Sequence, residues 1–283
     1  MTITRVFFYI ALLSSIFVPN CVADNIIVIA DIHGDLNRFK YILRDAGILD
    51  NHDKWCAPQN TTVIQLGDQI DPKTIDAHDI SRKHHFKMIY YTNYLANEAK
   101  NANSSFVSMI GNHEHMNIDK IRNKSELMNI IAKRPIIRKI ENYIFCHASL
   151  KKVHYDIMNK YSLTFDDIND LWTKYVLGET LSDTDNELLD TLIIGNNSII
   201  YTKNADNKDD ISHVLDAYSV DYMIVGHLVT KYIHLKNRIW YLDQLLKRAF
   251  DEYIYSYISI DSGDFQIKSL RKYMINNFFL SIF

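Results

Sequence analysis

The chain has 283 residues, of which 47% are hydrophobic and 23% are charged, as in an ordinary globular protein. This composition argues against an intrinsically disordered chain, and the length allows either one large domain or two small ones. The formal net charge of −3 gives no reason to expect binding to nucleic acid or to an anionic membrane.

The N-terminal residues have the pattern of a secretory signal peptide. A short basic segment, Met1–Arg5, precedes an apolar run over residues 6–18, and Cys21 and Ala23 place small residues where signal peptidase cleaves. We expect residues 1–23 to be removed and residues 24–283 to be secreted or kept in the lumen of the secretory pathway. The alternative is a membrane anchor, although the apolar run is shorter than the roughly 20 residues that span a bilayer. The mature chain is therefore expected to have no stable membrane span.

Four Asn-x-Ser/Thr triplets agree with a secretory route and predict a glycoprotein. Of the three cysteines, Cys21 would leave with the signal peptide. The other two, Cys56 and Cys146, either pair in an oxidising compartment or stay as buried free thiols. The four triplets begin at Asn60, Asn103, Asn123 and Asn196.

After the signal peptide, apolar strands alternate with helical segments. Each predicted strand is a short Ile- and Val-rich run followed by a polar loop. This alternation predicts the βα units of a layered α/β protein. Strands are expected over residues 25–30, 62–66 and 106–110, and helices over residues 36–46 and 76–102.

The second half of the chain continues with strands, helices and strands again, without a change of composition. An antiparallel pair is predicted over residues 136–140 and 142–146. We therefore expect residues 24–283 to form a single α/β domain with two mixed sheets flanked by helices. The remaining helices are expected over residues 151–178, 181–192 and 211–218, and the remaining strands over residues 221–225, 237–243, 253–261 and 265–270.

Each apolar strand ends in polar side chains that are able to bind metal ions. In open α/β sheets, ligands bind outside the carboxyl ends of the strands, so these side chains are expected to converge. Their mixed oxygen and nitrogen atoms suit divalent ions such as Mn, Fe or Zn. The candidate residues are Asp31 with His33, Asp68, Asn112 with His113, His147 and His227.

A two-metal site accounts for these residue types. Two cations about 3.5–4 Å apart need a carboxylate that bridges them, together with nitrogen and oxygen ligands on either side. Such a pair lowers the pKa of a bridging water, and the resulting hydroxide attacks phosphorus in line. A neighbouring imidazolium then protonates the leaving alkoxide.

Five ordered motifs resemble those of the calcineurin-like metallophosphoesterases, over about residues 25–243. The segments around His147, over residues 167–171 and over residues 226–230 are similar to the bacterial-type, Shewanella-like branch of the phosphoprotein phosphatases. The resemblance implies a two-sheet metallophosphoesterase sandwich with two divalent metal ions. The motifs are Asp31-x-His33, Gly67-Asp68-x-x-Asp71, Gly111-Asn112-His113-Glu114, His147 and Gly226-His227.

The resemblance also implies a role for each matched residue. His113 would act as the general acid, oriented by Asp71, and Glu114 would support the ligands from outside. Asn112 would also contact the substrate phosphate. Val229 stands where another branch has a second metal-binding histidine, which leaves three protein ligands on the first metal and favours the phosphatase branch. The first metal would be bound by Asp31, His33 and Asp68, and the second by Asp68, Asn112, His147 and His227.

Two phosphate-binding arginines of the phosphatase branch are absent here. Pro72 and Lys73 stand where an arginine normally follows Asp71, and residues 200–203 lack the second arginine. Lys73 and Lys203 either supply positive charge to the substrate phosphate, without the planar fork of arginine, or are solvated surface lysines.

The resemblance implies hydrolysis of phosphomonoesters, with a phosphorylated small molecule or a phosphoprotein as substrate and no nucleic acid as partner. Activity as a protein serine/threonine phosphatase is the narrower expectation. Because the arginines are missing, two alternatives stay open. One is a phosphodiesterase or nucleotidase, and the other is a secreted metal-binding pseudoenzyme that acts through partner binding.

Overall fold

The computed structural model describes residues 25–71, 86–203, 207–244 and 252–273. The predicted signal peptide, residues 1–23, lies outside these ranges, as do Lys73 and the first part of the helix expected over residues 76–102. Within the described ranges, no helix is both long enough and apolar enough to cross a membrane.

The first sheet is built from the N-terminal strands and the C-terminal hairpin. Its strands are β1 (Asn25–Ile29), β2 (Thr61–Gln65), β3 (Ser105–Ser108), β9 (Glu252–Asp261) and β10 (Asp264–Tyr273). Their order is β10-β9-β1-β2-β3, with β1, β2 and β3 parallel and with β9 antiparallel to both of its neighbours. The parallel strands are connected through helices α1 (Leu36–Asp45) and α2 (Lys87–Asn101). The predicted βα units are therefore present.

The second sheet also has five strands, in the order β4-β5-β6-β8-β7. The predicted antiparallel pair is confirmed as β4 and β5, and β6 and β8 extend the sheet in parallel. The short edge strand β7, antiparallel to β8, was not predicted. The strands are β4 (Ile137–Ile140), β5 (Tyr143–Cys146), β6 (Tyr222–Val225), β7 (His234–Lys236) and β8 (Ile239–Tyr241).

Helix α1 shows how the sequence places these elements. Asp35 begins the helix, because its carboxylate accepts a hydrogen bond of 2.9 Å from the backbone N–H of Arg38. The side chains of Phe39, Ile42 and Leu43 recur at helical spacing and are fully buried against the first sheet.

One predicted helix is divided in the structure. Residues 151–178 form α6 (Lys152–Lys160) and α7 (Phe165–Leu177), separated by a turn in which Ser162 has a positive φ of 54°. Thr164 begins α7 through reciprocal hydrogen bonds with Asp167, a capping pair that overrides the continuous helical pattern. The other helices are α3 (Asn112–Met116), α4 (Ile118–Ile121), α5 (Ser125–Ala132), α8 (Asp183–Leu189) with a π-helical turn to Ile194, and α9 (Lys208–Ala217).

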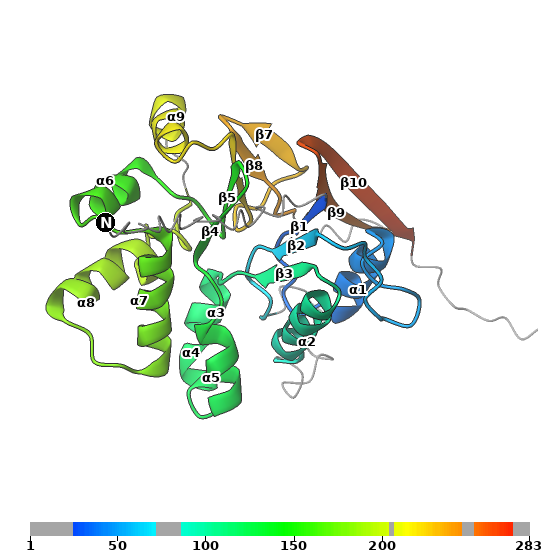
Figure 1. Cartoon of the computed structure of the whole chain (residues 1–283), viewed down its shortest axis with the longest axis horizontal. Coiled ribbons are helices and arrows are strands. Elements are labelled where there is room, and N and C mark those ends of the chain that lie inside the picture. The colour runs from blue at the N-terminus through cyan, green and yellow to red at the C-terminus, as the bar shows by residue number, and fades with distance from the viewer. Residues whose placement is uncertain (1–24, 72–85, 204–206, 245–251, 274–283) are drawn as a thin grey trace, which may run out of the picture.

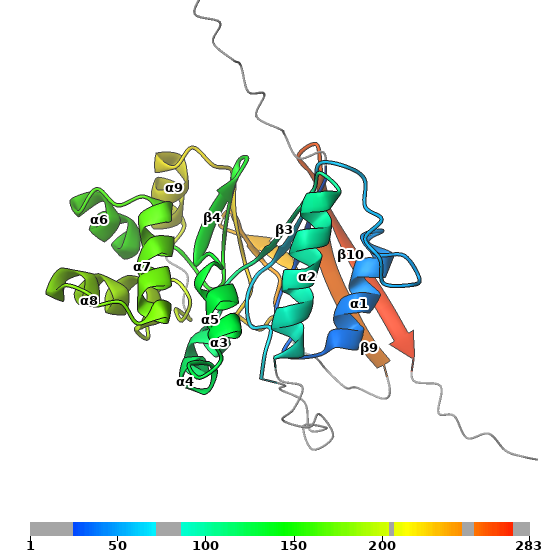
Figure 2. The ribbon, with the colours of Figure 1, turned by 60° about the horizontal axis from the view of Figure 1, so that its bottom comes forward.

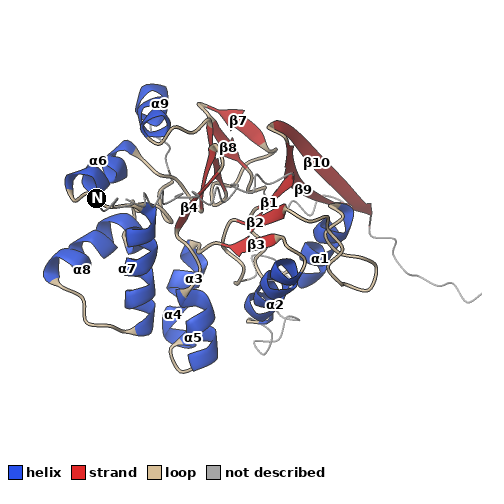
Figure 3. Cartoon of the chain, viewed as in Figure 1, coloured by secondary structure: helices blue, strands red, loops and turns tan. Residues whose placement is uncertain are grey.

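The two sheets pack against each other, and helices cover their outer faces (Figures 1 and 3). Val28, Phe145 and Ile258 belong to the apolar cluster between the sheets. Helices α1 and α2 cover the first sheet, and α6 to α9 lie on the far side of the second, as the turned view shows (Figure 2). The expected α/β sandwich of two sheets flanked by helices is confirmed. Of the two alternatives for the cysteines, the structure has free thiols: Cys146 is buried as expected, whereas Cys56 is exposed.

Candidate active site

The predicted ligands converge where the loops after β1, β2, β3, β5 and β6 meet. The backbone N–H groups of Ile32 and His33 donate to the carbonyl oxygen of Asp68, at 3.1 and 2.9 Å, so the first two loops are joined directly. On the other side, the N–H of Gly226 donates to the carbonyl oxygen of His147 at 2.8 Å. Hydrogen bonds between loops therefore fix the positions of the candidate ligands.

Four site residues have a left-handed backbone, which is uncommon for residues other than glycine. The φ angles are 48° at His33, 51° at Asp68, 60° at Asp71 and 59° at His227. Each such conformation costs about 1–3 kcal/mol and is typical of functional loops that the surrounding fold holds in place. The strained residues lie at the strand ends where the sequence predicts the metal-binding site.

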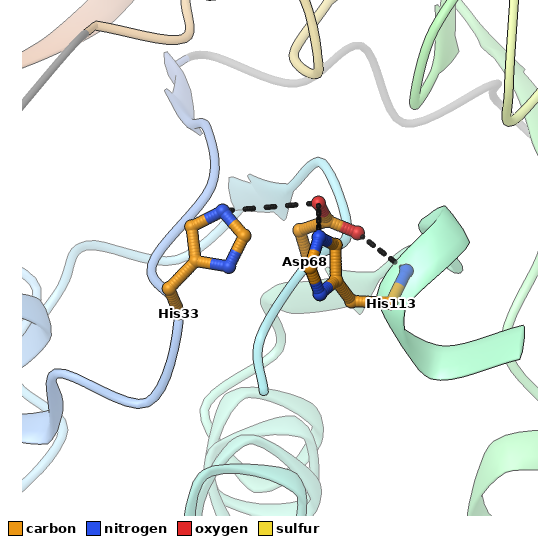
Figure 4. A group of neighbouring side chains, drawn as sticks. All are labelled: His33, Asp68 and His113. Atoms are coloured by element: carbon orange, nitrogen blue, oxygen red, sulfur yellow. Dashed lines mark hydrogen bonds and ion pairs between the residues drawn. The ribbon is translucent and has the colours of Figure 1, made fainter. Parts of the chain in front are cut away.

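Asp68 lies at the centre of the site and is 1% exposed. Its Oδ2 is 3.8 Å from Nε2 of His33 and 3.6 Å from Nε2 of His113 (Figure 4). Its Oδ1 is 3.3 Å from Nε2 of His147 and accepts a hydrogen bond of 2.9 Å from the backbone N–H of His113. The two oxygens of this carboxylate thus face different groups of imidazoles.

Two groups of side chains are close enough to hold a metal ion, and both include Asp68. One group is His33, Asp68 and His113, and the other is Asp68, His147 and His227, with the ligand atoms within 4.8 Å of one another. A carboxylate shared by two groups is the arrangement that a dinuclear centre requires. His113, expected as an acid rather than a ligand, lies in the first group.

Asp31, on the loop after β1, lies beside the first group. Its Oδ1 accepts a hydrogen bond of 3.1 Å from the backbone N–H of His227. Its Oδ2 is buried, has no hydrogen-bond partner among the described residues and lies 3.7 Å from Nε2 of His33. A buried carboxylate oxygen with no donor is costly in a folded protein, and a bound cation would satisfy it.

The hydrogen bonds of the histidines select the nitrogens that would bind metal. Nδ1 of His147 donates to the carbonyl oxygen of Leu66 at 2.8 Å, because a carbonyl oxygen accepts only. Nε2 of the same ring then faces Oδ1 of Asn112 at 3.0 Å and Oδ1 of Asp68. In the same way, Nδ1 of His33 donates to the carbonyl oxygen of Ile70 at 3.2 Å. Fixing Nδ1–H on a carbonyl is how proteins orient Nε2 toward a metal.

The electrostatics of the site also favour a cation. Burial opposes a charge on His147, but the carboxylates of Asp68 and Asp31 outweigh burial and raise the pKa of His147 to about 10. Burial acts to raise the pKa of Asp31, yet His147 and His33 together hold it below its usual value. The converging oxygens therefore attract positive charge, which a proton supplies in the absence of a metal. These donor atoms and this charge fit two divalent cations.

Two glycines allow the carboxylates to lie against the backbone. A Cβ on Gly111 would collide with the side chain of Asp68 and with the ring of His147, and a Cβ on Gly226 would collide with the carboxylate of Asp31. The glycines that precede Asn112 and His227 in the predicted motifs are thus required by space, because any side chain there would displace a ligand.

Glu114 holds two of the loops together from beneath the site. Its buried carboxylate accepts backbone hydrogen bonds from Asp68 (2.8 Å), Gln69 (2.7 Å) and Gly111 (2.8 Å). Burial, reinforced by the charge of Asp68, raises the pKa of Glu114 to about 7, while the backbone donors act in the opposite direction. Glu114 therefore fixes the position of Asp68 relative to the start of α3.

Arg134, which the sequence did not indicate, extends this support. Its guanidinium is 6% exposed and donates to Oε1 of Gln69 (2.6 Å), Oγ1 of Thr92 (2.8 Å) and the carbonyl oxygen of Ile89 (2.9 Å). Burial lowers its pKa to about 10, and the charge of Glu114 partly offsets that shift. Arg134 thus connects helix α2 to the residue that follows Asp68.

Replacing Arg134 with methionine is expected to lower the free energy of unfolding by about 3 kcal/mol, because Gln69 and Thr92 lose a buried charged donor. Thermal or urea unfolding of the purified protein measures this change. The control is Arg138→Met, which removes an exposed guanidinium 3.9 Å from Asp166 and should cost no more than about 0.5 kcal/mol. Equal stability of the two variants would contradict the supporting role of Arg134.

His113 lies on α3 with one ring nitrogen held by a carboxylate. Its Nδ1 is 3.2 Å from Oδ2 of Asp71. Asn117 donates to the same carboxylate and also, at 2.9 Å, to the carbonyl oxygen of His113. The sequence analysis did not predict a role for Asn117. Its position four residues after His113 could have indicated the contact, because residues four apart on a helix are neighbours.

Of the three residues predicted to bind the substrate phosphate, the structure places only Asn112 at the site. Asn112 lies beside the second group of side chains, because its Oδ1 is 3.0 Å from Nε2 of His147. Lys203 is exposed, and Lys73 lies outside the described residues. The roles of both lysines stay predictions.

Comparison with known proteins agrees with this geometry. Residues 25–231 match the calcineurin-like phosphoesterase family. The chain is 32% identical over 96 residues to Shewanella-like protein phosphatase 2 of Arabidopsis thaliana, covering 34% of this chain and 22% of that protein. It is 26% identical over 233 residues to Shewanella-like protein phosphatase 1 of Plasmodium berghei, covering 71% of this chain and 60% of that protein. The chain therefore spans less than two thirds of the length of either relative.

Two kinds of solved structure share the fold. The cold-active protein-tyrosine phosphatase of a psychrophilic Shewanella superposes with a TM-score of 0.68 at 15% identity, covering 88% of this chain and 80% of that one. A protein serine/threonine phosphatase from Saccharomyces cerevisiae superposes with a TM-score of 0.54 at 15% identity, covering 89% and 81%. At this identity the likeness shows the fold alone.

Proposed function

Because the chain belongs to the calcineurin-like phosphoesterase family, we propose that it is a metal-dependent hydrolase of phosphomonoesters. The observation that carries the proposal is the position of Asp68, whose carboxylate is shared by two groups of side chains able to hold a metal. A site for a single ion would not need a carboxylate whose two oxygens face two different groups of imidazoles.

Asp31, His33 and Asp68 would hold one cation, and Asp68, Asn112, His147 and His227 the other. When bound, two divalent cations supply an activated water as nucleophile and neutralise the charge on the phosphoryl oxygens. The protein contributes the fixed Nε2 atoms of His33 and His147 and a buried setting that strengthens these electrostatic interactions.

His113 is proposed to protonate the leaving oxygen. Its Nδ1–H bonds to Asp71, so Nε2 is the nitrogen that holds the transferable proton. The His113 side chain is 19% exposed, whereas that of His33 is 4% exposed. The more exposed ring lies on the side that substrate can reach, which favours the role of acid over that of ligand.

The names of the two curated relatives indicate a class of substrate. Both curated relatives carry names of protein phosphatases. The segments around His147 and over Gly226–Thr230 also resemble that branch. We propose a phosphoprotein or a small phosphorylated molecule as the substrate.

A phosphodiesterase is the second candidate, and it rests on one observation. Pro72 and Lys73 replace the arginine that clamps a phosphate monoester in the related branch. A monoester dianion depends more on such a charge than a diester monoanion does. The loss of the arginine therefore weakens the preference for monoesters.

The purified protein, loaded with Mn, Fe or Zn, should be assayed with an aryl phosphate, a phosphopeptide and an aryl phosphodiester. We expect kcat/KM to be higher for the monoesters than for the diester. Faster turnover of the diester would replace the proposed function with that of a phosphodiesterase. Two bound metals without turnover of any of the three would favour the pseudoenzyme.

A further inference from the structure

A ring of aromatic side chains adjoins the metal-binding residues on the outer side of α3. His115 lies among Trp172, Tyr175 and Tyr201, with ring centroids 6.5, 6.0 and 5.7 Å away. The hydroxyl of Tyr201 is 2.8 Å from Nδ1 of His115 and 3.4 Å from the carbonyl oxygen of Asn112. The role described for the metal ligands uses neither His115 nor Tyr201.

The hydrogen of Tyr201 is weakly engaged when Nδ1 of His115 carries the ring hydrogen, an arrangement in which Nε2 accepts from the hydroxyl of Tyr175 at 3.5 Å. In this tautomer, Nδ1 donates to the oxygen of Tyr201. The hydrogen of Tyr201 then points to the carbonyl oxygen of Asn112, and 3.4 Å is long for an O–H···O bond.

A phosphate oxygen would be a better partner for that hydrogen. Charge-assisted hydrogen bonds are roughly twice as strong as bonds between neutral groups, so a phosphate would displace the long contact with the carbonyl. The ordinary pKa of a phenol is about 10, so Tyr201 keeps its hydrogen at neutral pH. Tyr201 is half-buried, which leaves part of its side chain accessible to a ligand.

We propose that the Tyr201 hydroxyl, held by His115, donates a hydrogen bond to the substrate phosphate beside Asn112. This proposal rests on the proposed function. The segment over residues 200–203, which is the expected counterpart of the segment with the second arginine in the related branch, contains no arginine.

A hydroxyl in place of an arginine affects the preference between phosphate monoesters and diesters. A neutral hydroxyl contributes one hydrogen bond, whereas arginine contributes two and a positive charge. Tyr201 therefore supports binding of any phosphate ester but adds little preference for the dianion of a monoester. The chain is expected to discriminate between monoesters and diesters less than a phosphatase that has the arginine.

The test compares Tyr201→Phe with the unmodified protein, using inorganic phosphate as the probe. We expect the dissociation constant of phosphate, measured by calorimetry on the Mn-loaded protein, to rise about tenfold or more, because a hydrogen bond to a charged group is lost. The kcat/KM for an aryl phosphate should fall by a similar factor while the bound Mn per chain stays the same. The matched control is Tyr218→Phe, which removes a half-buried hydroxyl near Met158 and should change neither value.

The outcomes separate this inference from the proposed function. If the unmodified protein hydrolyses the aryl phosphate but Tyr201→Phe binds phosphate with unchanged affinity, the role of Tyr201 is wrong and the proposed function stands. If the unmodified, metal-loaded protein hydrolyses no phosphate ester, the proposed function itself fails. If Tyr201→Phe loses bound Mn, Tyr201 is a structural support of Asn112, and the inference is overturned.

Discussion

Replacement of Asp68 with asparagine is expected to lower kcat/KM for an aryl phosphate by at least about 10³-fold, which corresponds to roughly 4 kcal/mol of transition-state stabilisation. Asparagine keeps the shape of the side chain but has one oxygen and no charge. It therefore cannot face both ligand groups that now share the carboxylate, at 3.6 Å from His113 and 3.3 Å from His147. The number of bound Mn ions per chain should fall below two.

Steady-state kinetics and metal analysis of the same samples check this prediction. Asp264→Asn, an exposed substitution at the start of β10, is the control for loss of one carboxylate and should keep both activity and metal. A variant at Asp68 that binds two Mn ions and retains activity within tenfold of the original would show that Asp68 does not bridge the metals.

Replacement of His113 with asparagine is expected to lower kcat/KM by about 10²–10⁴-fold for a substrate with a poor leaving group. The loss should shrink as the leaving group becomes more acidic, because an aryloxide that leaves readily needs little help from a proton donor. Asparagine cannot donate the proton that Nε2 of His113 holds while Nδ1 bonds to Asp71. The measurement is kcat/KM for a series of phosphate monoesters of decreasing leaving-group pKa.

The substrate series, together with the number of Mn ions bound by the variant, decides between the two roles that the geometry allows for His113. As a general acid it should be replaceable without loss of metal, so both Mn ions should remain bound in the variant. As a ligand in the group with His33 and Asp68, its loss should remove one ion and slow all substrates by the same factor. His52→Asn, an exposed substitution in a loop, is the control and should behave like the unmodified protein.

The strand ends could be predicted because their signal is local. A short apolar run that stops at Asp31 or Asp68 indicates both the strand and the position of the ligand, and the parallel order of strands then brings the ends together. The glycines at 111 and 226 belong to the same local signal, because they leave room for the carboxylates of Asp68 and Asp31.

The residues that support the candidate ligands could not be predicted, because their roles depend on contacts between segments that are distant in the sequence. Arg134 bonds to Gln69 across 65 residues, and Tyr201 lies beside Asn112 across 89 residues. No periodic pattern or short motif indicates these contacts, so only the folded arrangement shows them. The division between α6 and α7 was missed for a different reason, since the Thr164 capping pair lies inside a segment whose composition is helical throughout.

The most direct test of a dinuclear phosphoesterase is the rate of aryl phosphate hydrolysis as a function of the number of Mn ions bound per chain. Metal-free protein would be titrated with Mn, and bound metal and initial rate would be measured at each step. The shared position of Asp68 predicts little activity with one ion and full activity as the second ion binds. Full activity with a single bound ion, or two bound ions with no hydrolysis, would contradict this assignment.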